Sequence, residues 1–201
     1  MNEQILVVPS DKIDFFDKFK NGWAEFEDSD NVLIDLLQHG QFMDRKEAEE
    51  NPNFKQIIPY CVVRDGYRGK YFIYQRNKKG GVKRLHNLYS LGLGGHCRDI
   101  DGDSTIEVFF NGLNRELQEE LGFSKKSYHG VTLGFIYDDS NFVGQVHLGV
   151  ATLITPFSDL VKIHPEDTMV NYGFKYLDEL NSIKDNCETW SQIILDNNIL
   201  K

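Results

Sequence analysis

Short apolar runs divide the middle of the chain into segments that favour β-strands. Residues 56–64 (QIIPYCVVR) and 70–76 (KYFIYQR) are rich in β-branched and aromatic side chains, and the Asp65-Gly66 pair between them is a typical hairpin turn. Another strand is predicted at the start of 88–96 (LYSLGLGGH), where it opens into a glycine turn. Further apolar runs predict strands at residues 5–8, 129–139 and 145–157.

Apolar residues at helical spacing lie on both sides of these strands. Residues 31–50 are predicted to form helices, with a break around Gly40 and a stop at Asn51-Pro52. Ser10, followed by the acidic segment DKIDFFDKF, predicts another helix start. Further helices are predicted over 106–121, which has the strongest pattern, over 177–186 and over 188–200. Central strands with helices before and after them predict a mixed α/β (α+β) layered domain.

The composition narrows the class of protein. A chain of 201 residues suffices for one large domain or for one domain with an elaboration. With 31 acidic against 22 basic residues the net charge is −9, which argues against a general nucleic-acid binder and suits a protein that holds cations with carboxylates. Three scattered cysteines form no disulfide framework. The absence of a signal-peptide pattern and of an apolar run of about 18 residues predicts a cytoplasmic protein without a membrane span.

One segment combines glycines and acids in a pattern with chemical consequences. Gly94-Gly95 is followed by Glu107 and then by residues 115–123 (RELQEELGF). A helix places three carboxylates of this segment on one face, those of Glu116, Glu119 and Glu120. Like charges at this spacing repel one another, whereas a divalent cation would stabilise them because hard cations take oxygen ligands. Gly122 follows the last turn, where a glycine commonly ends a helix.

The segment 94–123 resembles the Nudix box, the signature of the Nudix (MutT-like) hydrolases, which reads G-x5-E-x7-R-E-U-x-E-E-x-G-U with U a bulky aliphatic residue. From Glu107 onward every fixed position fits, with a phenylalanine as a variation at the last one. Eleven residues instead of five separate Gly95 from Glu107, which indicates a six-residue insertion before the helix. The family implies that Glu107 pairs with Arg115. Together with Ser104, Glu107 also fits a capping box that would serve only to start the helix.

This resemblance implies a Nudix fold with a central mixed sheet between helices, in which 1–55 form an N-terminal extension and 56–201 the Nudix domain. The implied reaction is hydrolysis of a diphosphate bond in a nucleoside diphosphate linked to another moiety, with Mg²⁺ or Mn²⁺ as the cofactor. Arg115 would hold the catalytic helix in place, and Gly94 would lie where the backbone approaches metal or phosphate. Metal ligation and base assistance would come from Glu116, Glu119 and Glu120, with the backbone carbonyl of Gly95 as a further ligand.

Several other readings stay open at this point. The acids could form a solvated helix face, as most acidic stripes do. A Nudix domain could bind a nucleotide-like ligand without cleaving it, although a pure binder has no need of three crowded carboxylates. Decapping of messenger RNA is disfavoured by the negative net charge. Cys97 beside the glycine turn is also similar to the Nudix-related isoprenoid diphosphate isomerases, which the surrounding residues match poorly.

A basic cluster between Arg76 and Arg84 provides candidate contacts to a substrate. These two arginines are predicted to bind phosphate, because a diphosphate needs cations opposite its metal carboxylates. The expected partner is thus a small nucleoside diphosphate derivative and neither a nucleic acid nor a membrane, and a second copy of the chain in a homodimer is a further candidate partner.

For a few residues the pattern leaves two roles open. Aromatic residues that could either stack on a base or sugar or pack in the core are Tyr60, Tyr89 and Trp190. His147 is either a core histidine or part of a cleft, and Glu166 is a candidate base in a loop. The acids from Asp99 to Asp103 do not form an EF-hand, because the sixth and twelfth positions hold serine and phenylalanine.

Overall fold

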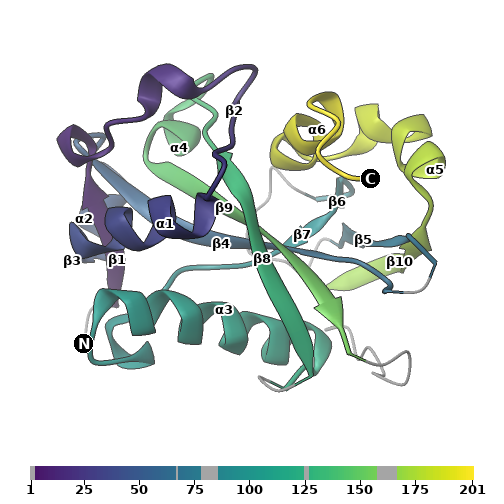
Figure 1. The fold of residues 1–201 in the computed structure, drawn as a ribbon, viewed down its shortest axis with the longest axis horizontal. Helices are drawn as coiled ribbons and strands as arrows, with labels where there is room; N and C mark the ends of the chain where they lie inside the picture. Colours follow the sequence, from purple (N-terminus) through teal and green to yellow (C-terminus); the bar gives the residue numbers. More distant parts are fainter. Residues whose placement is uncertain (1–2, 67, 78–85, 125–126, 158–166) are drawn as a thin grey trace.

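A mixed β-sheet lies at the centre of the molecule in the computed structural model, which describes residues 3–66, 68–77, 86–124, 127–157 and 167–201 (Figure 1). Its strands follow the order β2-β8-β9-β4-β1-β3, and β7 pairs with β4 beside this path. β4 runs parallel to β9, whereas the other pairs in this sheet are antiparallel. The bounds of these strands are Gln4–Pro9 (β1), Trp23–Ala24 (β2), Gln41–Asp44 (β3), Phe54–Val63 (β4), Gly92–Leu93 (β7), Tyr128–Ile136 (β8) and His147–Pro156 (β9).

Side chains alternate between the two faces of this sheet and form two separate cores. Along β4, Ile57 and Cys61 join one buried cluster, while Tyr60 and Val62 join the other. The first face is covered by α1 (Ser29–Gln38) and α3 (Thr105–Leu121), and the second by α5 (Leu177–Ser182) and α6 (Thr189–Asp196). The predicted fold class, a mixed sheet between two layers of helices, is therefore confirmed.

A second sheet of three strands has the order β10-β5-β6, with bounds Tyr71–Arg76 (β5), Tyr89–Ser90 (β6) and Met169–Lys175 (β10). The chain turns at the predicted place, since the backbone N–H of Asp65 donates to the carbonyl of Lys70 (2.8 Å), but β5 then pairs with β10 and β6. The sequence pattern did not predict β10. Only its first residue is buried, so it carries no apolar run.

Two predictions for the N-terminal region are wrong. The segment after Ser10 forms two single 3-10 turns, Ser10–Lys12 and Phe16–Lys18, instead of a helix. The Ser10 hydroxyl does not cap these turns, because it donates to the carbonyl of Pro52 (3.0 Å) and accepts from Lys55 (3.0 Å). The break around Gly40 is confirmed, but β3 stands between α1 and the short α2 (Arg45–Ala48) where helix was predicted throughout.

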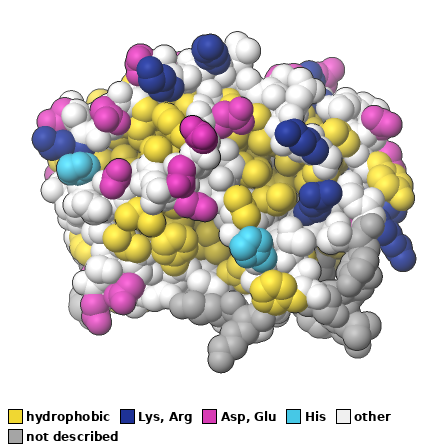
Figure 2. All heavy atoms as spheres, in the orientation of Figure 1, with side chains coloured by type: hydrophobic (Ala, Val, Ile, Leu, Met, Phe, Trp, Pro, Cys, Tyr) yellow, Lys and Arg dark blue, Asp and Glu magenta, His cyan; other side chains and the backbone are white. Residues whose placement is uncertain are grey.

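The N-terminal 55 residues contribute strands to the same central sheet. β1 pairs with β3 on one side and with β4 on the other, and β2 pairs with β8. Within the described part of the chain, no helix is long and apolar enough to cross a membrane. On the face shown in Figure 2, the described Lys and Arg side chains lie in small separate groups among acidic and hydrophobic ones.

Candidate active site

The Gly94-Gly95 turn brings the end of β7 against both β4 and α3. A Cβ atom at Gly94 would collide with the backbone carbonyl of Pro59 in β4, and one at Gly95 would lie 2.6 Å from a carboxylate oxygen of Glu116. A side chain at Gly94 would therefore force the turn away from β4, and one at Gly95 would displace the Glu116 carboxylate. The two glycines let the backbone approach a carboxylate of the acidic helix closely.

Local signals define α3 at both ends. The hydroxyl of Ser104 accepts from the backbone N–H of Glu107 (3.2 Å), which satisfies one of the first N–H groups of the helix. Gly122 adopts a left-handed conformation (φ 74°) and its N–H bonds back into the last turn. These caps confirm the predicted helix, which begins one residue earlier than expected.

The three carboxylates of α3 differ in their surroundings. The Glu116 carboxylate lies against the backbone of Gly95. Burial raises the pKa of Glu116, although the nearby charge of Arg115 opposes this effect. The side chain of Glu119 is 52% exposed and lies 3.9 Å from the guanidinium of Arg98. Glu120 is buried, and its charge acts on Tyr74 and Arg76 of β5. The helix therefore presents a graded series of carboxylates, from exposed to buried.

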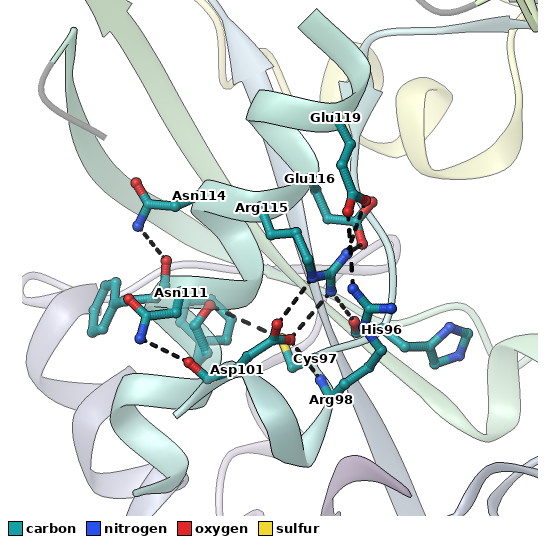
Figure 3. Close-up of polar contacts among 11 residues, drawn as sticks. His96, Cys97, Arg98, Asp101, Asn111, Asn114, Arg115, Glu116 and Glu119 are labelled. Carbon is teal, nitrogen blue, oxygen red and sulfur yellow. Dashed lines mark hydrogen bonds and ion pairs between the residues drawn. The ribbon is translucent and has the colours of Figure 1, made fainter. Parts of the chain in front are cut away.

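Arg115 is the centre of a network that joins α3 to the glycine turn (Figure 3). Its guanidinium contacts Asp101 with two nitrogens, Nε to Oδ1 (3.0 Å) and Nη2 to Oδ2 (3.2 Å). Nη1 donates to both Glu116 (2.5 Å) and Glu119 (3.2 Å), and Nη2 also donates to the backbone carbonyl of His96 (2.8 Å). Arg115 therefore holds the turn and two carboxylates in one arrangement.

The expected pairing of Glu107 with Arg115 is wrong. The Glu107 carboxylate accepts from the backbone N–H of Asp103 (3.1 Å), as part of the helix start. The partner of Arg115 is Asp101, whose side chain is only 7% exposed and also accepts from the backbone N–H of Arg98 (2.8 Å). Asp101 follows Gly95 after five residues, as the acid of the box does. With Asp101 in the place of the box acid, the six extra residues lie between Asp101 and Arg115.

A cavity of about 610 Å³ opens beside the turn. Gly94 and Arg76, two of the three predicted substrate-binding residues, line it together with Gly95, the predicted carbonyl ligand. Arg84, the third, and the candidate base Glu166 lie outside the described residues. Among the described residues, the Arg76 guanidinium makes no hydrogen bond and packs over the ring of Tyr74 (5.2 Å from its carbon Cζ to the ring centroid). The other walls come from β4, α2, the short α4 (Phe142–Gln145) and the start of α6.

The α6 wall contains a buried carboxylate that the sequence pattern did not single out. Glu188 is 9% exposed and accepts hydrogen bonds from the hydroxyls of Tyr60 and Ser191 and from the backbone N–H of Trp190 (3.1 Å). Tyr60 and Trp190 both line the cavity, whereas Tyr89 packs against the second core. No periodic pattern marks Glu188, because it precedes a helix of only eight residues.

The histidines and Cys97 now have defined positions. His147 lines the cavity, and its ring centroid lies 5.8 Å from that of His96. Burial, reinforced by Arg45, His147 and Arg115, lowers the pKa of His96 to about 3. Cys97 is buried under α3, and burial raises the pKa of its thiol well above the usual value, so it is not an activated nucleophile.

The residues of this site fit a divalent cation in part. Two carboxylates, those of Glu116 and Glu119, converge on one cationic nitrogen of Arg115, and the backbone of Gly95 lies beside Glu116. Carboxylate and carbonyl oxygens are the ligands that Mg²⁺ and Mn²⁺ prefer. Across the described ranges, however, no three His, Cys, Asp or Glu side chains are already gathered as a metal site.

Known proteins resemble this chain along nearly its whole length. Protein YmaB of Bacillus subtilis (strain 168) is 36% identical over 205 residues, which cover 98% of this chain and 97% of YmaB. The crystal structure of Tm1382, a protein assigned to the Nudix hydrolases, is 33% identical and covers 98% of each chain with a TM-score of 0.79. MutT of Methanosarcina mazei Go1 shares the fold at 14% identity, with a TM-score of 0.51 over 73% of this chain and 96% of MutT. No family model matches the chain.

A glycine turn held against an acidic helix, beside a mixed sheet between helical layers, defines the Nudix class of folds. The similarity to Tm1382 extends over the entire fold and includes one third of the residues. The chain belongs to the Nudix hydrolases.

Proposed function

We propose that this protein is a divalent-metal-dependent hydrolase that cleaves a diphosphate bond in a nucleoside diphosphate linked to another moiety. The observation that carries the proposal is the glycine turn: Gly94 and Gly95 line the cavity, and a Cβ atom at Gly95 would lie only 2.6 Å from a carboxylate oxygen of Glu116. Oxygen ligands and an open space for substrate thus lie side by side. The cavity is also of the size that small-molecule sites usually have.

Cationic and anionic groups on the cavity wall suit a diphosphate ester. Arg76 has no hydrogen-bonded counter-ion among the described residues, so its guanidinium is available for two parallel contacts to phosphate oxygens. Arg45 also lines the cavity, but Glu3 (2.8 Å) and Glu49 (3.1 Å) already engage it. Arg76 is therefore the better candidate for phosphate binding.

The acidic helix would hold the cofactor. Glu116 and Glu119, with the carbonyl of Gly95, would be ligands of Mg²⁺ or Mn²⁺, and Glu120 would complete the set or assist as a base. When bound, the cation would neutralise the diphosphate and activate water for attack on phosphorus. Arg115 would keep the turn and the helix in register while this chemistry takes place, through its contacts to Asp101 and to the carbonyl of His96.

A substrate panel tests this proposal. The purified protein would be incubated with nucleoside diphosphate sugars, dinucleoside polyphosphates, dinucleotide cofactors, nucleoside triphosphates and prenyl diphosphates, each with Mg²⁺, with Mn²⁺ or with a chelator. We expect phosphate-containing products from at least one nucleoside diphosphate derivative, no products with the chelator, and full recovery when the metal is restored. Activity that persists in the chelator would overturn the metal requirement.

A second candidate function is nucleotide binding without cleavage. It is favoured by the contacts of Arg115 to both Glu116 and Glu119, because a cation already occupies the position in front of these carboxylates. In that case ligands from the same panel would bind, as measured by calorimetry, and none would be hydrolysed with either metal.

A further inference from the structure

We infer that the α6 wall of the cavity is a subsite for a planar aromatic base, in which Trp190 provides the stacking surface. The inference rests on the proposed function, because it identifies the part of the substrate that lies beyond the diphosphate. Trp190 lines the cavity together with Tyr60, Glu188 and Arg76. The charges of Glu188, beside Trp190, and of Glu120, in the acidic helix, both act on Arg76.

Three contacts fix the position of the Trp190 ring. The backbone N–H of Trp190 donates to the Glu188 carboxylate (3.1 Å), at the start of α6. Tyr60 meets the indole edge to face, with ring centroids 5.5 Å apart and an interplanar angle of 73°. The far edge of the indole packs on Gly149 of β9, where an added Cβ atom would lie only 2.8 Å from the ring.

The contacts that fix Tyr60 are equally specific. Its hydroxyl donates to Glu188 and lies 2.8 Å from the hydroxyl of Ser191, which in turn accepts from the backbone N–H of Leu91 (2.9 Å). Glu188 is therefore buried among hydroxyl groups that satisfy its charge. An aromatic surface held in this way loses little conformational freedom when a ligand binds to it.

The cavity thus joins an aromatic surface to a cationic one. Arg76, which lines the cavity near the α6 wall, is charged as arginines in proteins always are, and although burial opposes it, the carboxylates of Glu120 and Glu188 raise its pKa further. A ligand that fits both surfaces has a planar ring attached to a phosphate chain. A nucleoside diphosphate has this chemistry, whereas inorganic pyrophosphate lacks the ring and a prenyl diphosphate carries a flexible apolar chain instead.

Isothermal titration calorimetry in the presence of Mg²⁺ tests the subsite, with ADP, inorganic pyrophosphate and geranyl diphosphate as probes. We expect ADP to bind at least about tenfold more tightly than pyrophosphate, since stacking on an aromatic side chain contributes about that much per base. Trp190→Ala should remove this advantage and leave pyrophosphate binding unchanged, whereas Trp190→Phe should keep most of it. Equal affinity of the Trp190→Ala protein and the wild type for ADP would overturn the inference, as would tighter binding of geranyl diphosphate.

A second variant displaces the ring without removing it. Gly149→Ala would push the indole out of position, and we expect the same loss of ADP preference as in Trp190→Ala. Gly173→Ala is the matched control, because a Cβ atom at Gly173 of β10 meets nothing within 4 Å, and its binding should equal that of the wild type. These measurements do not require turnover. An ADP preference that depends on Trp190 in a protein that hydrolyses nothing would support the subsite and reject the proposed reaction.

Discussion

The glycine turn and the start of α6 both line the cavity, and the buried carboxylates next to them are held in opposite ways. Beside the glycine turn, Glu116 and Asp101 are paired with the guanidinium of Arg115. On the α6 side, Glu188 is surrounded by hydroxyl groups and one backbone N–H. Charge pairs can rearrange when a cation binds, whereas a carboxylate satisfied by neutral donors keeps its place. The first side is therefore suited to chemistry and the second to recognition of a rigid ligand.

The largest effect should come from removing charge on the acidic helix. Glu119→Gln and Glu120→Gln should each lower kcat by roughly 100-fold, or about 2.7 kcal/mol of transition-state stabilisation, if these groups act with the metal. Binding of ADP on the α6 side should change far less. Steady-state kinetics on the best substrate of the panel, together with calorimetry, would measure both effects. Full activity in a protein that carries both substitutions would rule out their catalytic assignment.

The extent to which the sequence predicts this site depends on how local each feature is. The bounds of α3 follow from Ser104, the apolar spacing and Gly122, all of which act within one or two turns. The ion-pair partner of Arg115 does not follow from local signals. Asp101 has the spacing of the family pattern from Gly95 and Glu107 has it from Arg115, and only the path of the loop decides which acid meets the guanidinium. A motif therefore identifies the helix better than it identifies the ion pair.

The same reasoning explains the elements that were missed. β3 has only one buried residue, Met43, and β10 only Met169, so hydrogen bonds to β1 and β5 define them and not an apolar pattern. Glu188 directly precedes the short helix α6 and was not singled out, while for Trp190, within α6, the pattern left stacking and core packing open. Their role follows from long-range contacts to Tyr60 and Gly149, which no local pattern reveals.

A loss of stability of intermediate size should distinguish Asp101 from Glu107 as the partner of Arg115. Asp101→Asn breaks a largely buried pair with Arg115, which costs up to about 3 kcal/mol. In a chain of this length that corresponds to a fall in Tm of about 5–10 °C. It should also lower kcat, because the glycine turn is released from α3. Thermal unfolding and kinetics of the same samples would measure the two effects.

Glu107→Gln is the matched control for this substitution. Glu107 is exposed and accepts only at the helix start, so its replacement should change the stability by no more than about 0.5 kcal/mol and leave kcat unchanged. If Glu107→Gln proves the more damaging of the two variants, the box acid is Glu107 after all.

The smallest effect, a rise in KM, should come from replacing Arg76, which lines the cavity. Arg76→Ala removes a guanidinium that has no hydrogen-bonded partner among the described residues, so the free protein should lose little stability. The bound diphosphate would lose one charged contact, worth about 1.5–3 kcal/mol, and KM should rise by at least about tenfold with kcat nearly unchanged. Arg64→Ala is the matched control, because Arg64 also has a buried Nε atom without a hydrogen bond but lines a separate cavity with Tyr71 and Lys201. A KM within about twofold of the wild-type value for both variants would show that phosphate is held by other groups.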